Sequence, residues 1–141
     1  MSKYQTPYQA LGEEGIRKIC NAFYDIMEDL PEAADVRRMH ADDLEPMKVK
    51  LADYLTGWMG GPPLYADKHG TVCMTTPHEH YPIGPRERDQ WLLCMEKALI
   101  ATEVEEEVRD MLKQPLFRVA DAVRNRAESI TNDDPNIIAI G

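Results

Sequence analysis

Apolar residues recur at helical spacing along nearly the whole chain, and this periodicity constrains the fold more than any other feature. An amphipathic helix places an apolar residue every three or four positions, whereas a half-buried strand alternates at every second residue. The first clear stripe predicts a helix from about Glu13 to Asp29, with apolar positions at Ile16, Ile19, Phe23, Ile26 and Leu30. No segment requires the alternation of a strand, so the sequence predicts an all-α protein.

Prolines and glycines predict where the next helices begin and end. Pro31 ends the first helix, and a short second helix is expected from there to about Met39. A third helix is expected to start near Pro46, because proline suits the first turn of a helix. The Gly-Gly-Pro-Pro run at residues 60–63 then ends that helix.

Two further helices are predicted in the second half of the chain. Gly84-Pro85 begins the first of them, with Glu87 three residues past the cap. A capping box that starts at Thr102 begins the last helix, which Pro115 either kinks or splits. The 141 residues fit a single domain, with a core over about residues 8–128 and a loosely held C-terminal tail over 129–141.

Residues 64–82 form the least regular segment and contain three of the four histidines. A loop of this length in a compact domain usually has a function. His78 and His80 lie close together in it, and three interpretations fit them: exposed histidines of a solvated loop, ligands of a zinc site, or one axial ligand of haem iron. The zinc site is disfavoured because no third ligand is evident. The residues alone leave the other two interpretations open.

The charge balance argues against several classes of partner. The chain has 25 acidic and 16 basic side chains and a net charge of −9. Phosphate backbones and anionic membrane surfaces repel such a chain, so we expect neither a nucleic-acid nor a membrane partner. Cys20, Cys73 and Cys94 fit neither a disulfide framework nor a zinc pattern. The start of the chain lacks a targeting pattern, and together these features predict a cytoplasmic protein.

Four segments of the chain form a distinctive set: Ala-Phe-Tyr-Asp at 22–25, Gly-Trp-Met-Gly-Gly-Pro-Pro at 57–63, His-Glu-His-Tyr-Pro-Ile at 78–83 and Glu-Arg-Asp-Gln-Trp-Leu-Leu-Cys-Met at 87–95. Together they resemble the group II truncated haemoglobins of the two-over-two globin family. They occur in the family's order with nearly its spacing, and the resemblance extends over about residues 8–126. It implies a globin-like, truncated two-over-two helical sandwich and haem b (iron protoporphyrin IX) as the cofactor.

The resemblance also implies roles for individual residues. His78 matches the proximal ligand of the haem iron. Tyr24, Trp91 and His40 match distal positions whose side chains stabilise a bound ligand, and the family varies among Tyr, Phe and His at position 40. The other pocket residues that the resemblance implies are Phe23, Met47, Leu51, Tyr54, Tyr65, Lys68, Tyr81 and Met95.

The chain departs from the family pattern at several of these positions. Met47 stands where many globins place a distal His or Gln, and a methionine donates no hydrogen bond. Residues 74–77 read Met-Thr-Thr-Pro, whereas relatives often have arginines there that bind the haem propionates. Lys68 and Tyr65 are the predicted substitutes for those arginines. His80 stands where relatives commonly have proline, and we expect it to be solvated.

The function that the resemblance implies is the binding of O₂ and other diatomic ligands at a His-ligated iron. Tyr24, Trp91 and His40 together supply up to three donors to a ligand. Each hydrogen bond to a charged group contributes about 1.5–3 kcal/mol, which is about one to two decades of affinity. Slow ligand release suits O₂/NO or reactive-species chemistry better than bulk oxygen transport. The ligands implied are O₂, NO, CO or peroxide, with an unidentified reductase as partner.

Several alternatives stay open beside this function. NO dioxygenase- or peroxidase-like activity is one of them, although a neutral histidine ligand lacks the electron push of a thiolate. A haem-based gas sensor acting through a partner is another, and a haem-free helical interaction module is a third. The sequence is compatible with either a monomer or a dimer.

Overall fold

The computed structural model describes residues 4–70 and 83–124, which form helices and the turns between them. Neither range contains a strand, and the predicted all-α class is confirmed. The elements are α1 (Pro7–Asp29), the 3-10 turn η1 (Pro31–Ala33), α2 (Ala34–Arg38), α3 (Glu45–Trp58), α4 (Leu64–His69), α6 (Pro85–Ala101) and α7 (Glu106–Ala122).

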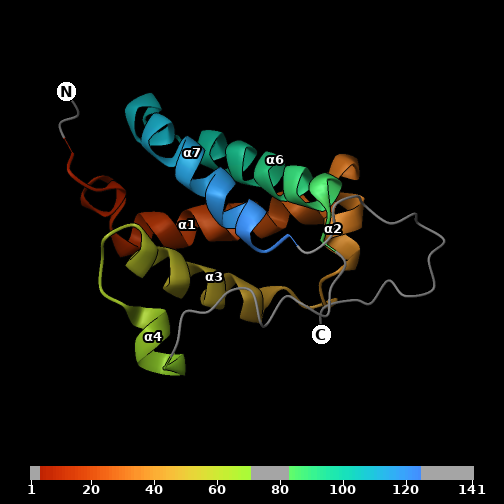
Figure 1. Ribbon diagram of the computed structural model, residues 1–141, viewed down its shortest axis with the longest axis horizontal. Coiled ribbons are helices and arrows are strands. Elements are labelled where there is room, and N and C mark those ends of the chain that lie inside the picture. Colours follow the sequence, from red (N-terminus) through yellow and green to blue (C-terminus); the bar gives the residue numbers. More distant parts are fainter. Residues whose placement is uncertain (1–3, 71–82, 125–141) are drawn as a thin grey trace.

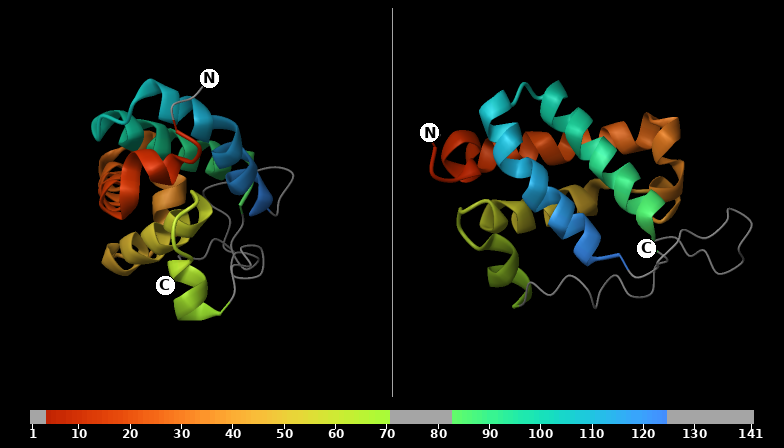
Figure 2. Two further views of the ribbon diagram at one scale, coloured as in Figure 1. Left: turned by 90° about the vertical axis from the view of Figure 1, so that its left-hand side faces the viewer. Right: turned by 45° about the horizontal axis from the view of Figure 1, so that its top comes forward.

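The four long helices form two pairs that pack on each other (Figure 1). α1 packs against α3 on one side and against α6 on the other, and α6 packs against α7. α4 continues from the end of α3 and contacts it. The views in Figure 2 show the α6–α7 pair crossing the α1–α3 pair. The predicted two-over-two helical sandwich is therefore confirmed.

α1 is longer than the sequence predicted and bends at Gly12. The Thr6 side chain caps the helix, because its Oγ1 accepts a hydrogen bond from the backbone N–H of Gln9 at 3.2 Å. Gly12 has φ of 67° and ψ of 174°, a conformation that residues with a side chain rarely adopt. The predicted start at Glu13 is the residue after this bend. The turns from Pro7 to the bend carry too few apolar positions to show a stripe.

α3 begins in the predicted place, with Pro46 in its first turn. The glycines and prolines after it bring the chain back against α1, and a Cβ at Gly61 would lie 2.5 Å from the ring of Tyr8. α4 then begins at Leu64, directly after Pro63, where the sequence predicted no regular structure. A proline both ends one helix and fits the start of the next, and the prediction used only the first property.

α6 begins as predicted, whereas α7 does not. The backbone N–H of Gly84 donates to Oε1 of the buried Glu87 at 2.7 Å, which completes the expected cap. The capping box predicted at Thr102 is wrong. The Thr102 hydroxyl instead donates to the carbonyl of Ala98 at 2.8 Å and so belongs to the end of α6. α7 begins only at Glu106.

α7 continues through Pro115 as one helix, so the predicted split does not occur. A proline removes one helical hydrogen bond and disfavours the turn before it. Arg88 of α6 holds the helix beyond that point. Its Nη1 donates to Oδ1 of Asp121 at 2.9 Å, and its guanidinium lies 4.9 Å from the centre of the Phe117 ring. These contacts stabilise the second half of α7 on α6.

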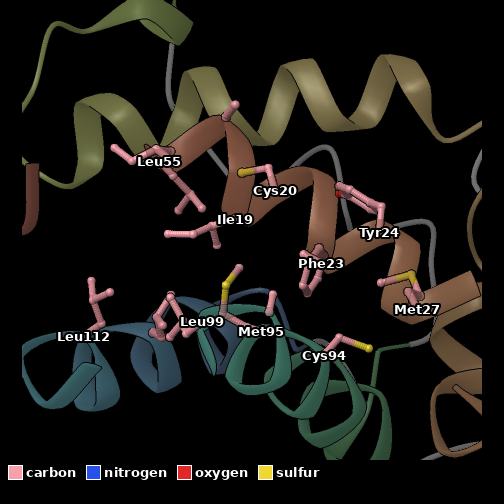
Figure 3. Packing of buried hydrophobic residues seen from close by; sticks show 14 of the residues in the cluster. Ile19, Cys20, Phe23, Tyr24, Met27, Leu55, Cys94, Met95, Leu99 and Leu112 are labelled. Carbon is pink, nitrogen blue, oxygen red and sulfur yellow. The ribbon is translucent and has the colours of Figure 1, made fainter. Parts of the chain in front are cut away.

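The hydrophobic core lies between the two helix pairs (Figure 3). Ile19 and Phe23 of α1 point toward Met95 and Leu99 of α6, and all four are buried. Part of the stripe predicted for the first helix is only partly buried, namely Ile26 and Leu30. Within residues 4–70 and 83–124, no helix combines the length and the hydropathy that crossing a membrane requires.

Candidate functional site

Tyr24, Trp91 and His40 are joined by successive ring contacts through Phe23 and Tyr24 of α1. The rings of Phe23 and Tyr24 meet edge to face, with centroids 4.8 Å apart. Trp91 of α6 meets Phe23 in the same manner at 5.1 Å. His40, in the turn after α2, meets Tyr24 at 5.7 Å. The structure therefore brings the three predicted distal side chains into one aromatic cluster, although they are distant in sequence.

Tyr24 keeps its phenolic proton in this cluster. Its side chain projects from α1 to the side nearer α3, while Phe23 points toward α6 (Figure 3). Tyr24 is 2% exposed. Burial, with a smaller contribution from the neighbouring Cys20, raises the pKa of its hydroxyl above the usual value. The hydroxyl is therefore a hydrogen-bond donor over the physiological pH range.

The turn of residues 40–42, which we call the His40 corner, is held by α2 and α1. Nδ1 of the His40 ring lies 2.9 Å from the carbonyl oxygen of Val36. The guanidinium of Arg37 donates to the backbone carbonyls of residues 40, 41 and 42 at 3.3, 3.0 and 3.1 Å. Its Nε donates to the carboxylate of Glu28 on α1. The backbone of the corner is thus fixed independently of the histidine ring.

α2 is also bonded to α6, one residue before Trp91. The side-chain oxygen of Gln90 accepts a hydrogen bond from the backbone N–H of Val36 at 3.1 Å, and its nitrogen donates to Asp35 at 2.8 Å. Arg86 lies 3.0 Å from the same Asp35 oxygen. These bonds fix α2 on α6, and with it the separation between the His40 corner and Trp91.

α3 carries a row of large apolar side chains that are only half-buried. They recur three or four residues apart and pack against the core: Met47, Leu51, Tyr54 and Trp58. Tyr54 also meets Tyr65 of α4, with ring centroids 6.1 Å apart, and burial raises the pKa of Tyr54. Two other predicted pocket residues, Phe23 and Met95, are fully inside the core. The row offers an apolar surface that suits a large, flat hydrophobic ligand.

Asp53 is a buried carboxylate on the same helix, α3, and the sequence did not lead us to expect it. It is 1% exposed and binds Arg17 at 2.9 Å and Lys68 at 2.7 Å. Burial alone would raise the pKa of Asp53, but hydrogen bonds from Lys68 and Arg17 outweigh it and lower the pKa. Lys68, predicted to bind a haem propionate, therefore has an acidic partner within the chain. The sequence signal that could have revealed this buried carboxylate is an acidic residue within the apolar stretch from Ala52 to Leu55.

Three predicted features lie outside this arrangement. His78 and Tyr81, together with His80, fall within residues 71–82, outside the residues that the structure describes. The roles predicted for them remain predictions.

A cleft of about 210 Å³ lies between the start of α1 and the α6–α7 turn, lined in part by Leu11, Lys18 and Val108. It contains none of the predicted site residues.

Comparisons with known proteins match nearly the whole chain. Residues 6–125 match the family model described as bacterial-like globin. The group 2 truncated haemoglobin YjbI of Bacillus subtilis (strain 168) is 31% identical over 126 residues, 89% of this chain and 93% of that protein. These matches include the aromatic cluster and the α3 row.

Solved structures agree in fold as well as in sequence. The group II 2-on-2 haemoglobin from the plant pathogen Agrobacterium tumefaciens is 41% identical, with a TM-score of 0.81, and the match covers 88% of this chain and 97% of that one. The truncated oxygen-avid haemoglobin from Bacillus subtilis is 31% identical, with a TM-score of 0.78 and coverage of 86% and 100%.

Proposed function

This chain belongs to the bacterial-like globins, and among them to the group II truncated haemoglobins, and we propose that it binds haem and takes up O₂ beside Tyr24, Trp91 and His40. The observation that carries the proposal is the aromatic cluster itself. Its members come from α1, α6 and the His40 corner, and their rings are 4.8–5.7 Å apart in successive contacts.

The residues present fit a haem group. The half-buried row of α3 supplies an apolar surface through Met47, Leu51 and Tyr54. Tyr65 of α4 supplies a hydroxyl for the polar propionate edge, and the Lys68 ammonium, paired with Asp53 at 2.7 Å, would have to be shared between that carboxylate and a propionate. His78 is the axial ligand that the resemblance implies. Haem, when bound, supplies an iron that takes up diatomic ligands reversibly.

The side chains of the cluster determine how long a ligand stays. The buried hydroxyl of Tyr24 keeps its proton, which supports a role as a donor to the ligand. The indole N–H of Trp91 is the second donor of the proposal, and its ring meets Phe23 in the same cluster. Each hydrogen bond to a ligand that gains negative charge slows its escape by about one to two decades.

The finer function that we propose is O₂/NO or reactive-species chemistry, with haem b as the cofactor and a separate reductase as the partner. Slow release of O₂ disfavours bulk transport, because a carrier must give up its ligand readily. The oxygen-avid relative from Bacillus subtilis supports a slow release. O₂, NO, CO and peroxide are the small ligands that this pocket would discriminate.

The proposal is tested by absorption spectra of the purified, haem-reconstituted protein. Spectra are recorded in the ferric form and after dithionite reduction under CO, for the wild type and His78→Ala. The wild type is expected to show a haem spectrum and a CO adduct, and the variant to lose or change both. A protein that takes up no haem would refute the function, whereas an unchanged His78→Ala spectrum would refute only the ligand assignment.

A matched control is available on α4. His69 is exposed, and its ring packs on that of Tyr65 at 4.5 Å. His69→Ala removes an imidazole from the same region of the chain and should leave the spectrum unchanged. A His80→Ala variant separates the two neighbouring histidines in the same measurement.

A further inference from the structure

The bonds of Arg37 reach the backbone of the His40 corner rather than its side chain. They end on three successive carbonyls, at 3.3, 3.0 and 3.1 Å, and on the carboxylate of Glu28. The Arg37 side chain is 19% exposed; its bonds to the carbonyls of residues 40 and 41 are partly buried, whereas those to residue 42 and Glu28 are exposed. A guanidinium presents five donors in a rigid plane, whereas a lysine presents a single mobile ammonium. Lysine therefore cannot reproduce this set of bonds.

The contact between His40 and Val36 determines where the imidazole carries its proton. A carbonyl oxygen only accepts hydrogen bonds, so the 2.9 Å contact requires a proton on Nδ1. In the neutral ring the other nitrogen, Nε2, then has no proton and acts as an acceptor. The sequence led us to count His40 as a donor to a ligand. In the neutral ring, the structure instead makes it an acceptor.

We propose that Arg37 is a positioning residue that fixes the His40 corner, so that Nδ1–H stays bonded to Val36 and Nε2 acts as an acceptor in the aromatic cluster. The His40 ring lies beside that of Tyr24, at 5.7 Å between centroids, so its orientation affects how the Tyr24 hydroxyl is directed. The effect on ligands rests on the proposed function, whereas the tautomer follows from the hydrogen bonds alone.

The test uses the full-length protein labelled with ¹⁵N at histidine. Ring nitrogen shifts of His40 are measured by NMR in the haem-free protein and in the ferrous CO form, for the wild type and Arg37→Lys. The wild type is expected to show a protonated Nδ1 and an unprotonated Nε2. Arg37→Lys is expected to show a mixture of both tautomers, because the corner can then move away from Val36.

Two variants serve as controls for this measurement. Arg38→Lys changes the adjacent arginine, whose guanidinium pairs with Asp35 at 2.6 Å, and should leave the His40 shifts unchanged. Glu28→Gln weakens the ion pair of Arg37 but leaves its three carbonyl acceptors in place. It is also expected to retain the wild-type tautomer.

The O₂ dissociation rate provides a second readout that a general loss of stability would not reproduce. Arg37→Lys should lower this rate by up to about fivefold, because the second tautomer places a donor, Nε2–H, in the cluster and so adds about one hydrogen bond to the ligand. In a His40→Phe background the same substitution should have no further effect. The proposal is overturned if Arg37→Lys keeps the wild-type tautomer, or if it changes the rate equally in both backgrounds. The NMR result stands even if no haem is bound, so it fails separately from the proposed function.

Discussion

At the scale of single residues, the Tyr24 hydroxyl is the group whose removal isolates one hydrogen bond. The Tyr24 ring packs on Phe23 and can remain in place without its hydroxyl, whereas replacing the Trp91 indole by phenylalanine removes ring volume together with the N–H. Phenylalanine is the closest replacement for Tyr24 and keeps the edge-to-face contact. At this position, the consequences for ligand escape can therefore be separated from those for packing.

We expect Tyr24→Phe and Trp91→Phe each to raise the O₂ dissociation rate by about ten- to one-hundredfold, because each removes a donor to a charged ligand. Stopped-flow displacement of O₂ by CO measures the rate. Tyr4→Phe is the matched control, because its hydroxyl binds Glu105 at 2.9 Å, away from the cluster, and its rate should stay at the wild-type value. If neither distal variant differs from that control, these two side chains do not retain the ligand.

At this scale, a motif named positions that the structure brings together, whereas contacts that leave no pattern in the sequence were not foreseen. Tyr24 and Trp91 were identified through the family resemblance, and the structure brings them together. Arg37 and Gln90 were missed, because a side chain that bonds to backbone groups leaves no sequence pattern, whether those groups lie 3–5 residues away, as for Arg37, or 54 residues away, as for Gln90. Asp53 had a visible signal, an acidic residue on an apolar helix face, but its two cationic partners are 36 and 15 residues away.

At the scale of elements, the ion pairs of Asp53 join three helices. Arg17 lies on α1, Asp53 on α3 and Lys68 on α4, so one buried carboxylate anchors the short α4 to the longer helices. A helix of six residues is not stable alone in water, and its position depends on such contacts. The segment that contains His78 follows directly after α4. The ion pair between Asp53 and Lys68 therefore holds in place the helix that precedes that segment in the chain.

We expect Asp53→Asn to lower the free energy of unfolding by about 1–3 kcal/mol at pH 7, because two charge-assisted hydrogen bonds are weakened. The pKa of Asp53 is lowered in the folded state, so its contribution is present above the unfolded pKa of about 3.9 and is lost as the pH falls through the folded value. Urea unfolding at pH 7, 5 and 3 measures this difference between the wild type and the variant.

The difference should be largest at pH 7 and shrink at pH 3. Asp110→Asn, at an exposed position of α7, is the control and should change the unfolding free energy by less than about 0.5 kcal/mol at each pH. A difference for Asp53→Asn that is constant over the three pH values would show that the ionised carboxylate is not the stabilising group.

The boundaries of elements were predicted well only where a single local rule applied. Glu87 caps α6 as its spacing indicates, since both partners lie within one turn. Thr102 satisfies the same pattern, yet its hydroxyl donates to the last turn of α6. The end of α6 and the start of the next helix compete for this hydroxyl, and α6 holds it. Pro115 does not split α7, because Arg88 holds the helix beyond it. Tertiary contacts and competing local bonds decided these two cases.

At the scale of the whole molecule, the apolar stripes were sufficient to predict four packed helices and an all-α domain. They did not predict the pairing of these helices, which came from the resemblance and was confirmed. They also did not indicate the half-buried state of the α3 row, because periodicity reports which residues share a face and not what covers that face. A ligand that covers part of this row adds to the stability of the entire fold.

We expect haem to raise the thermal unfolding midpoint of the haem-free protein by about 10 °C or more when it is present at about a thousandfold above its dissociation constant. Circular dichroism follows the loss of helix during heating. Iron-free protoporphyrin IX is the control, since it offers the same apolar surface without an axial bond, and it should give a smaller shift. An unchanged midpoint with haem would contradict the proposed cofactor.

The backbone bonds of Arg37 have a consequence for which substitutions position 40 of this chain tolerates. They reach the carbonyls of residues 40–42 and would be the same whichever side chain position 40 carries. His40 can therefore be replaced by tyrosine or phenylalanine without rebuilding the turn that holds it. A library of variants at position 40 alone would therefore vary the side chain that is offered to a ligand, while the backbone of the His40 corner stays the same.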